Sequence, residues 1–563
     1  MSRIRLVLLV VVVGLSGCAG VPSSGPVYQA HAVLPAGTLE ELDVRVLPHG
    51  PAAGESPEQV VTGFLVASEN FDNAHAIARE FLTPAEAARW RDNAGVVEYQ
   101  TGSSALVRRS STAVELAVTR EAVISSGGDF RLAPGPFATT FGLARTTQGW
   151  RIDRAPDGLL LSSLDVARSY RRLQLYFPSP DGQVLVSDPV FMAADRLALP
   201  TLLVQRLLAG PSPWLAPAVS TVVPVGTTLL GNVPVTAGVA GVDLSRDLAA
   251  LNPSALDRLS AQLSWTLRQL PDVAAVELSS NGLPVAVPGL GERVAVSSWS
   301  QFDPDVVTGP PFVYLGRAGL RTPTGPVTGP LGRGAPWFSS PAVSLDGLRV
   351  AGLRAGSAGS TLYVGALTGR PVAVLSAAAF TPPSFDRFGR VWTVQTDGQG
   401  RQRVVVVDRE GRPTVVPAAE LLAAGPVQAL RVARDGARLA AIVGRGRAAR
   451  LVLARIDART IVDALRVLAP SYAGVVGLGW LDSDTVVALA RAGGSGPFGP
   501  VEVAIDGSVL TPIPVGGLPA ANPSTIAAAP DADLLVGSAG GIWAATAGGW
   551  RRVGSGLDPV YPG

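Results

Sequence analysis

The spacing of apolar residues changes along the chain, from a helical period near residue 60 to a strand period over much of the remainder. Ser56 followed by Pro57 is typical of a helix N-cap with proline in the first turn, and Val60 and Phe64 follow at helical spacing. A second short helix is predicted from Thr83-Pro84. Alternating segments come next, at 113–118, 130–132, 137–143 and 148–152. Helices that precede strands predict an α+β region over residues 55–160.

Residues 170–290 contain some segments with the helical spacing of apolar residues and others with the strand spacing. A strand is predicted over 172–177 and a helix over 199–208, which Gly210-Pro211 ends. Further strands are predicted around Val222 and Val233, and the segment 239–245 leads to a longer helix over 255–270. That helix has leucine at 256, 259, 263 and 267 along one edge. The last two strands, 273–278 and 283–287, are separated by Asn281-Gly282, which favours a type I′ hairpin turn.

From residue 312 onward the strand pattern repeats. We find five copies of a two-hairpin unit between residues 341 and 553, each with an aspartate beside its first turn. These turn aspartates are Asp346, Asp386, Asp435, Asp482 and Asp531, at spacings of 40, 49, 47 and 49 residues. Four strands per repeat at this period predict β-propeller blades. Residues 312–322 predict one more hairpin, and strands around 294–299 are expected to complete a sixth blade or close the ring. The prediction over 300–563 is a five- or six-bladed propeller.

The amino terminus predicts export. Arg3 and Arg5 precede an apolar stretch over 6–15, which is half the length that a membrane-spanning helix needs. Residues 1–17 are therefore interpreted as a signal peptide. The small residues that end in Gly17-Cys18 resemble a bacterial lipobox, which implies cleavage between these two residues and an N-palmitoyl, S-diacylglycerol Cys18. The alternative, a free cysteine in an uncleaved anchor, accounts less well for the charge, length and small residues in register.

Residues 18–54 are rich in proline and glycine and show little periodicity, which is typical of a tether. Two or more acyl chains are sufficient for stable anchoring. We therefore expect the mature protein to be held at the extracytoplasmic face of a membrane.

The composition of the chain excludes several kinds of binding and catalytic site. The 563 residues include 64 glycines and 47 prolines, and only 16% are charged, which suits many short strands and turns. A net charge of +2 without basic runs argues against nucleic-acid binding. The chain has no lysine, which excludes a P-loop lysine or a Schiff base. Its three histidines all lie at or before residue 75, and its only cysteine is Cys18, which excludes an internal disulfide and a Cys/His zinc cluster.

Several residues invite a catalytic or binding role, and each also has a structural explanation. His75 is expected to be a solvated histidine on a helix surface. Asp243 is expected to be a cap or turn residue rather than a ligand carboxylate, and the turn aspartates are expected to accept local backbone hydrogen bonds. Packing within the sheets is the expected role of the five propeller tryptophans. They are Trp337, Trp392, Trp480, Trp543 and Trp550. We assign no catalytic residue, metal ligand or cofactor.

The order of helices and strands over 55–160 resembles the NTF2-like domains. Three motifs in the second region resemble the GerMN domain: the Leu-Leu-Ala-Gly-Pro run that ends at 211, Pro224-Val225-Gly226-Thr227 and Val242-Asp243-Leu244-Ser245. Lipobox, NTF2-like region, GerMN domain and propeller in that order resemble the actinobacterial lipoprotein LpqB family, as does the mature start over residues 18–24. The resemblance implies a non-enzymatic accessory protein of the MtrA/MtrB two-component system. Such a protein contacts the extracytoplasmic part of the sensor kinase and modulates its signalling in cell-envelope homeostasis and division.

Two alternatives stay open. The first is a protein that binds cell-wall glycan or peptide. The second is an envelope hydrolase that uses carboxylates of the propeller channel, with or without calcium, because oxygen ligands are available. Three or more carboxylates around one point of the channel, or a metal there, would favour the second alternative over a docking protein.

Overall fold

A computed structural model describes residues 48–71, 74–193, 198–246, 248–306, 309–334, 337–496, 498–518 and 523–563. The predicted signal peptide, the lipidation site at Cys18 with its neighbour Gly17, and the tether up to residue 47 lie outside the described residues. Within the described ranges, none of the helices combines the length and the apolar character that crossing a bilayer requires.

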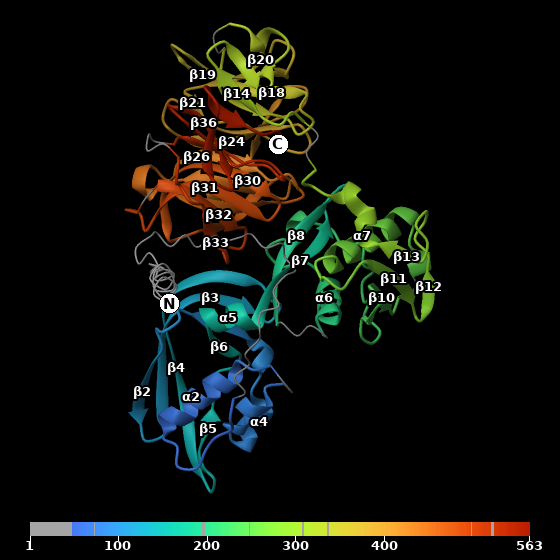
Figure 1. The fold of residues 1–563 in the computed structure, drawn as a ribbon, viewed down its shortest axis with the longest axis vertical. Helices are drawn as coiled ribbons and strands as arrows, with labels where there is room; N and C mark the ends of the chain where they lie inside the picture. The colour runs from blue at the N-terminus through green and yellow to red at the C-terminus, as the bar shows by residue number, and fades with distance from the viewer. Residues whose placement is uncertain are drawn as a thin grey trace, which may run out of the picture. The chain divides into compact units, whose positions relative to one another are not determined.

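The first region is a sheet covered by short helices, as the α+β prediction expected (Figure 1). A capping box begins α2 (Pro57–Ser68): the amide of Gln59 donates to the Ser56 hydroxyl, and the Gln59 side chain accepts from the Ser56 amide. The buried face of α2 carries Val60 and Phe64, which join the core between helix and sheet. Two shorter helices follow, α3 (Ala76–Glu80) and α4 (Pro84–Arg89).

The sheet of this region has the order β5-β4-β3-β1-β6, with β2 paired to β3. Its strands are β1 (Gly95–Tyr99), β2 (Ala105–Ser110), β3 (Ala113–Ser125), β4 (Phe130–Thr146), β5 (Gly149–Arg154) and β6 (Leu159–Ser162). The sequence predicted two strands over 130–143 where the structure has one long β4. An irregularity in the β3–β4 register between Arg120 and Ala122 keeps the strands paired past the Pro-Gly-Pro of residues 134–136.

A short helix, α5 (Ser163–Ser169), leads into the hairpin of β7 (Tyr170–Pro178) and β8 (Leu185–Ala193). Next come α6 (Leu199–Leu208), β9 (Val235–Thr236), β10 (Val239–Leu244), α7 (Pro253–Leu267), β11 (Ala275–Ser280), β12 (Leu283–Val285) and β13 (Arg293–Ala295). Parallel strands β10 and β11 are joined through α7, and the sheet order is β12-β11-β10-β9 with β13 beside β11. The predicted strand around Val222 is wrong, because that stretch is irregular and contains prolines, which donate no backbone hydrogen bond. The strand predicted around Val233 is the short β9, which begins two residues later and pairs with β10.

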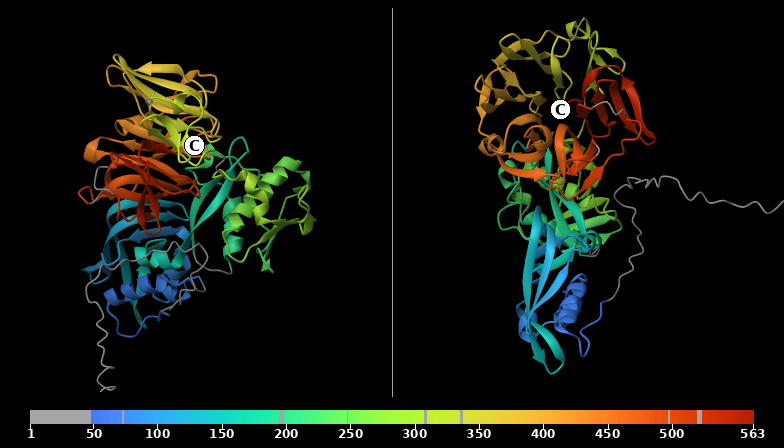
Figure 2. Two further views of the ribbon diagram at one scale, coloured as in Figure 1. Left: turned by 45° about the horizontal axis from the view of Figure 1, so that its top comes forward. Right: turned by 90° about the vertical axis from the view of Figure 1, so that its left-hand side faces the viewer.

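Six sheets, each of four or five strands, make up the propeller within the described residues, and Figure 2 shows them arranged around a ring. In chain order the blades are β14–β16 (Val313–Gly316, Gly319–Thr322, Gly325–Pro326), β17–β20 (Ser339–Val343, Arg349–Gly356, Gly359–Ala366, Val372–Ala377) and β21–β25 (Ala379–Phe380, Ser384–Phe385, Val391–Thr396, Gln402–Val407, Pro413–Val416). After α8 (Ala419–Ala423) come β26–β29 (Val427–Val432, Arg438–Val443, Arg450–Ile456, Val462–Leu468), β30–β33 (Tyr472–Asp482, Thr485–Ala492, Phe498–Ala504, Leu510–Pro512) and β34–β37 (Thr525–Ala527, Leu535–Ser538, Gly541–Thr546, Gly549–Gly554).

The ring is closed by the end of the chain. The last strand, β38 (Leu557–Val560), pairs antiparallel with β14 and completes the first blade. The expectation that residues 294–299 complete a blade or close the ring is wrong: β13 pairs with β11, and Val294 and Trp299 belong to the core of the second region. The predicted two-hairpin units are confirmed, and the sixth blade is built from both ends of the propeller sequence.

Candidate functional site

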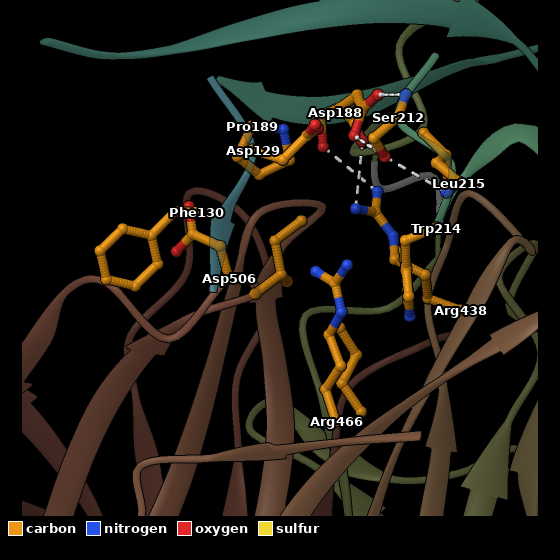
Figure 3. A pocket seen from close by; sticks show the side chains of 13 residues that line it. Asp129, Phe130, Asp188, Pro189, Ser212, Trp214, Leu215, Arg438, Arg466 and Asp506 are labelled. Atoms are coloured by element: carbon orange, nitrogen blue, oxygen red, sulfur yellow. Dashed lines mark hydrogen bonds between the residues drawn. The ribbon is translucent and has the colours of Figure 1, made fainter. Parts of the chain in front are cut away.

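The β7–β8 hairpin meets the propeller at a small polar cavity of about 20 Å³ (Figure 3). Side chains from distant parts of the sequence line it. Asp129 comes from the first region, Asp188 from β8, Trp214 from the loop after α6, and Arg438 and Arg466 from the propeller. We call this place the joint, because contacts of all three regions converge on it.

Arg172 of β7 contacts two carboxylates beside the joint, one of which, Asp506, lines its cavity. Its Nη2 lies 2.9 Å from Oδ1 of Asp484, and its Nε lies 2.7 Å from Oδ2 of Asp506. Both aspartates belong to turns of the β30–β33 blade, and the Asp506 side chain is almost fully buried. Burial opposes the charge on Arg172, but the two carboxylates hold its pKa above the usual range. The guanidinium therefore ties the hairpin to this blade.

A second arginine joins the next blade to β8. Arg438 forms a fully buried ion pair with Asp435, the turn aspartate of the β26–β29 blade. Its remaining donors reach Ser187: Nη1 donates to the carbonyl at 3.1 Å and Nη2 to the hydroxyl at 3.2 Å. The predicted structural aspartate therefore orients an arginine that crosses to the second region.

Two further groups of the joint, Asp188 and Trp214, have hydrogen-bond partners, and Arg466 lies against the Trp214 ring. Asp188, whose pKa is raised by burial, accepts from the amide of Ser212 at 2.6 Å and from its hydroxyl at 2.8 Å. Trp214 Nε1 donates to the carbonyl of Ala464 at 2.7 Å, and the guanidinium of Arg466 lies 4.6 Å from the centre of a Trp214 ring. The contacts at the joint therefore connect the β7–β8 hairpin and the loop after α6 to the propeller.

The turn aspartates act as predicted in four of the five blades. Oδ1 of the aspartate accepts from the amide two residues later at 2.8–3.0 Å, in the pairs Asp346–Leu348, Asp386–Phe388, Asp435–Ala437 and Asp482–Asp484. Asp531, in the remaining blade, adopts a left-handed backbone with φ of 53°. Among the described residues, no group of three or more acidic, histidine or cysteine side chains is placed to hold a metal.

The prediction for Asp243 is confirmed in part. Its Oδ1 accepts from the amide of Gly282 at 3.0 Å, so the carboxylate supports the Asn281-Gly282 turn, whereas Asn252 is the N-cap of α7. Asn281 and Gly282 both have positive φ, 50° and 77°, as a type I′ turn requires.

The prediction for His75 is wrong. The residue is 5% exposed, and its ring lies between those of Phe71 and Trp90, with centroid separations of 4.8 and 6.1 Å. Its backbone is left-handed, with φ of 58°, which turns the side chain inward just before α3. Burial lowers the pKa of the imidazole. His49 is exposed, and His31 lies outside the described residues.

The propeller tryptophans pack as expected. Trp392 is fully buried and donates to Asp386, while Trp480 and Trp550 are less than 9% exposed and donate to backbone carbonyls. Trp543 packs against the core that contains Trp550, and Trp337 stacks edge-on with Tyr363. Sequence patterns did not identify Arg172, Arg438 or Arg466, because their partners lie far away in the chain.

Three family descriptions match successive parts of the chain. They are "Lipoprotein LpqB, N-terminal domain" over residues 50–167, "Sporulation and spore germination" over 174–286 and "Lipoprotein LpqB beta-propeller domain" over 321–562. The chain is 31% identical to Lipoprotein LpqB of Thermobifida fusca, with 98% of this chain and 97% of that protein aligned. It is 30% identical to Lipoprotein LpqB of Mycobacterium tuberculosis over the full length of both.

Solved structures with some likeness include TolB from Acinetobacter baumannii, at 11% identity and a TM-score of 0.35, covering 56% of this chain and 86% of that one. Another is the first GerMN domain of the sporulation protein GerM from Bacillus subtilis, at 22% identity and a TM-score of 0.19, covering 22% of this chain and 94% of that domain.

The fold and the joint define a mainly β, multidomain protein in which a GerMN domain and its hairpin connect an α+β region to a six-bladed propeller. The chain belongs to the lipoprotein LpqB family. Its curated relatives are named as lipoproteins, in agreement with a membrane-anchored protein.

Proposed function

We propose that this protein is a lipid-anchored, extracytoplasmic accessory partner of the MtrA/MtrB two-component system, and that it modulates the sensor kinase by binding its extracytoplasmic domain. The observation that carries the proposal is similarity over almost the whole chain to proteins named Lipoprotein LpqB, together with the predicted lipobox at Cys18. Residues 18–54 serve as the tether in this proposal, and binding rather than turnover is the function.

The joint supports a docking role. Arg172 and Arg438 connect the GerMN hairpin to two neighbouring blades through buried or largely buried contacts. A partner that contacts one region therefore meets a surface whose position is restrained by the others, which lowers the entropy lost on binding.

The anchor is tested with Cys18→Ala in the full chain, with Ser16→Ala as the matched control, because alanine is also small at that position. We expect Cys18→Ala to lose incorporation of labelled palmitate and to leave the membrane fraction, while Ser16→Ala keeps both. A Cys18→Ala protein that is still acylated and membrane-bound would contradict the proposed anchor.

The partner is tested by photo-cross-linking on intact cells. A photoreactive residue is placed at Leu283, 71% exposed beside the turn of the β11–β12 hairpin, or at Val372, 63% exposed on the outermost strand of its blade. We expect an adduct that contains the sensor kinase at one of these positions, and altered kinase signalling in cells with Cys18→Ala. Adducts with peptidoglycan fragments alone, from protein shown to be folded, would instead favour the cell-wall-binding alternative.

A further inference from the structure

A second cavity, of about 50 Å³, lies in the central channel of the propeller. Its walls come from the innermost strands of all six blades, β17, β22, β26, β30, β34 and β38. Figure 2 shows the end of the chain inside the ring, and residues 559–563 form part of the lining. We call this space the channel cavity.

The channel cavity is lined by two arginines and by no aspartate or glutamate. The absence of acids is the opposite of what the hydrolase alternative required at this point of the channel. Arg431 lies on β26, and Arg434 lies in the turn that follows. The only other ionisable side chain in the lining is that of Tyr561, whose hydroxyl donates to the carbonyl of Asp533 at 2.6 Å.

Neither arginine has a carboxylate partner within ion-pair distance in the described part of the chain. Nη1 of Arg431 donates to the carbonyls of Pro383 and Leu430, at 3.1 and 3.0 Å. Nη2 of Arg434 donates to the carbonyl of Pro562 at 2.8 Å. Arg434 is only 7% exposed, and its Nη1 is buried without any hydrogen-bond partner.

A buried and a partly buried cation that have no carboxylate in direct contact are costly, because the protein interior solvates charge poorly. The desolvation is visible in both groups: burial lowers the pKa of Arg431 to about 10 and also lowers the pKa of Arg434. Arg438 in the same blade shows the usual solution, a buried ion pair with Asp435. The channel arginines lack such a contact: Asp558 acts on Arg431, and Asp305 and Asp482 act on Arg434, only from beyond ion-pair distance. Their guanidinium groups are therefore able to accept an anion as a direct partner.

We propose that the channel cavity binds a small oxyanion, a phosphate or carboxylate group, between Arg431 and Arg434. Guanidinium groups match the geometry of such oxyanions and bind them through pairs of N–H donors. A water needs roughly 10–15 Å³ on the same measure of volume, so the cavity has room for a headgroup of a few heavy atoms and none for a sugar ring. This site goes beyond the docking function and does not depend on it.

The test uses the full-length protein in detergent and two probes, inorganic phosphate and acetate, each titrated calorimetrically at constant ionic strength set with chloride. We expect saturable binding of at least one probe, at least tenfold weaker in Arg431→Gln and in Arg434→Gln. Arg403→Gln is the matched control, because Arg403 is an exposed arginine of β24 in the same propeller and loses the same charge. It is expected to bind like the wild type.

Arg434→Met provides a second readout, the melting temperature, which is measured without and with the probe. Removing an uncompensated buried cation is expected to raise the melting temperature without probe and to abolish any further rise when probe is added. Phosphate binding alone assigns the site to phosphate groups, acetate binding alone assigns it to carboxylates, and binding of both assigns it to oxyanions generally. Absence of saturable binding to the wild type, or unchanged affinity in both folded glutamine variants, would overturn the proposal.

Discussion

At the scale of single residues, the molecule depends on arginines that are buried against specific acceptors. The chain has no lysine, and the planar guanidinium allows one side chain to contact several acceptors at once. Arg172 contacts two carboxylates of one blade, whereas Arg438 contacts a carboxylate of its own blade and a serine of β8. Each arginine therefore contributes to stability mainly by pairing acceptors that would otherwise be buried without a hydrogen-bond or ionic partner.

Replacing Arg172 by methionine is expected to lower the free energy of unfolding by about 3 kcal/mol, because the buried Asp506 and the partly buried Asp484 would lose their cation. Urea unfolding followed by tryptophan fluorescence measures the loss. Arg171→Met is the control, since Arg171 is the exposed neighbour on the same strand. Equal unfolding curves for the two variants would show that the ion pairs of the joint contribute nothing to stability.

Glu98 on β1 predicts a dependence of stability on pH. Burial, and secondarily the charge of Glu121, raises the pKa of Glu98 from 4.5 to about 7. Between these values Glu98 is ionised in the unfolded chain but keeps its proton in the folded chain, so its contribution to stability is greatest below pH 4.5 and falls as the pH rises to 7. Glu69, whose pKa burial also raises to about 7, acts in the same direction.

Glu98→Gln is expected to remove the part of that fall which Glu98 contributes and to be more stable than the wild type at pH 7 by roughly 2 kcal/mol. Urea midpoints at pH 4.5, 6 and 7.5 measure the difference between the two proteins. Glu292→Gln, at an exposed position of the GerMN region, should follow the wild type at every pH. A Glu98→Gln curve parallel to the wild type would contradict the assignment.

At the scale of elements, local turn chemistry decides where strands pair. The Asn281-Gly282 turn has two positive φ angles and a carboxylate from β10 on the Gly282 amide. The same principle recurs in the propeller, where the turn aspartates hold the first hairpin of the blades. The sequence predicted these turns because the residues that contact one another in each turn lie within a few positions in the chain.

Gly282→Ala is expected to cost about 1 kcal/mol, because a φ of 77° is strained for any residue with a Cβ. Faster amide exchange in β11 and β12 and a lower urea midpoint measure the effect. Gly398→Ala is the control, since an added Cβ there meets no atom within 4 Å and the backbone is not left-handed. An equal response in the two variants would mean that the turn does not limit the stability of the hairpin.

At the scale of the whole molecule, β38 decides whether the propeller is closed. This strand and β14 lie at opposite ends of the propeller sequence, and their pairing completes the first blade. Val343 also bridges to Pro562, so the end of the chain contacts the second blade as well.

Removing residues 555–563 is expected to leave the ring open, to abolish cooperative melting of the propeller and to expose it to limited proteolysis. Leu557→Ser, at a half-exposed position of the same strand, keeps the backbone pairing and is expected to melt within a few degrees of the wild type. A truncated protein that melts like the wild type would show that closure through β38 is dispensable.

Sequence patterns predicted much of the architecture but only part of the contacts. The helices at 199–208 and near 253–267, the Asn281-Gly282 hairpin and the two-hairpin units all depend on residues close together in the chain, so their periodicity and turn signals identified them. The inward position of His75 was missed, because a left-handed turn rather than helical spacing sets its direction. The mispredicted strand around Val222 shows that apolar residues alone do not make a strand among prolines.

The sequence by itself determined the order of the regions, the repeat that builds the blades and the signal that predicts a lipid anchor. Each of these features depends on residues that lie close together in the chain. Tertiary structure alone decided which strand closes the ring, which arginines bind the hairpin to the propeller and which remain without a carboxylate in the channel. Those outcomes depend on pairs of residues up to several hundred positions apart, and their energies come from burial, which a linear pattern does not record.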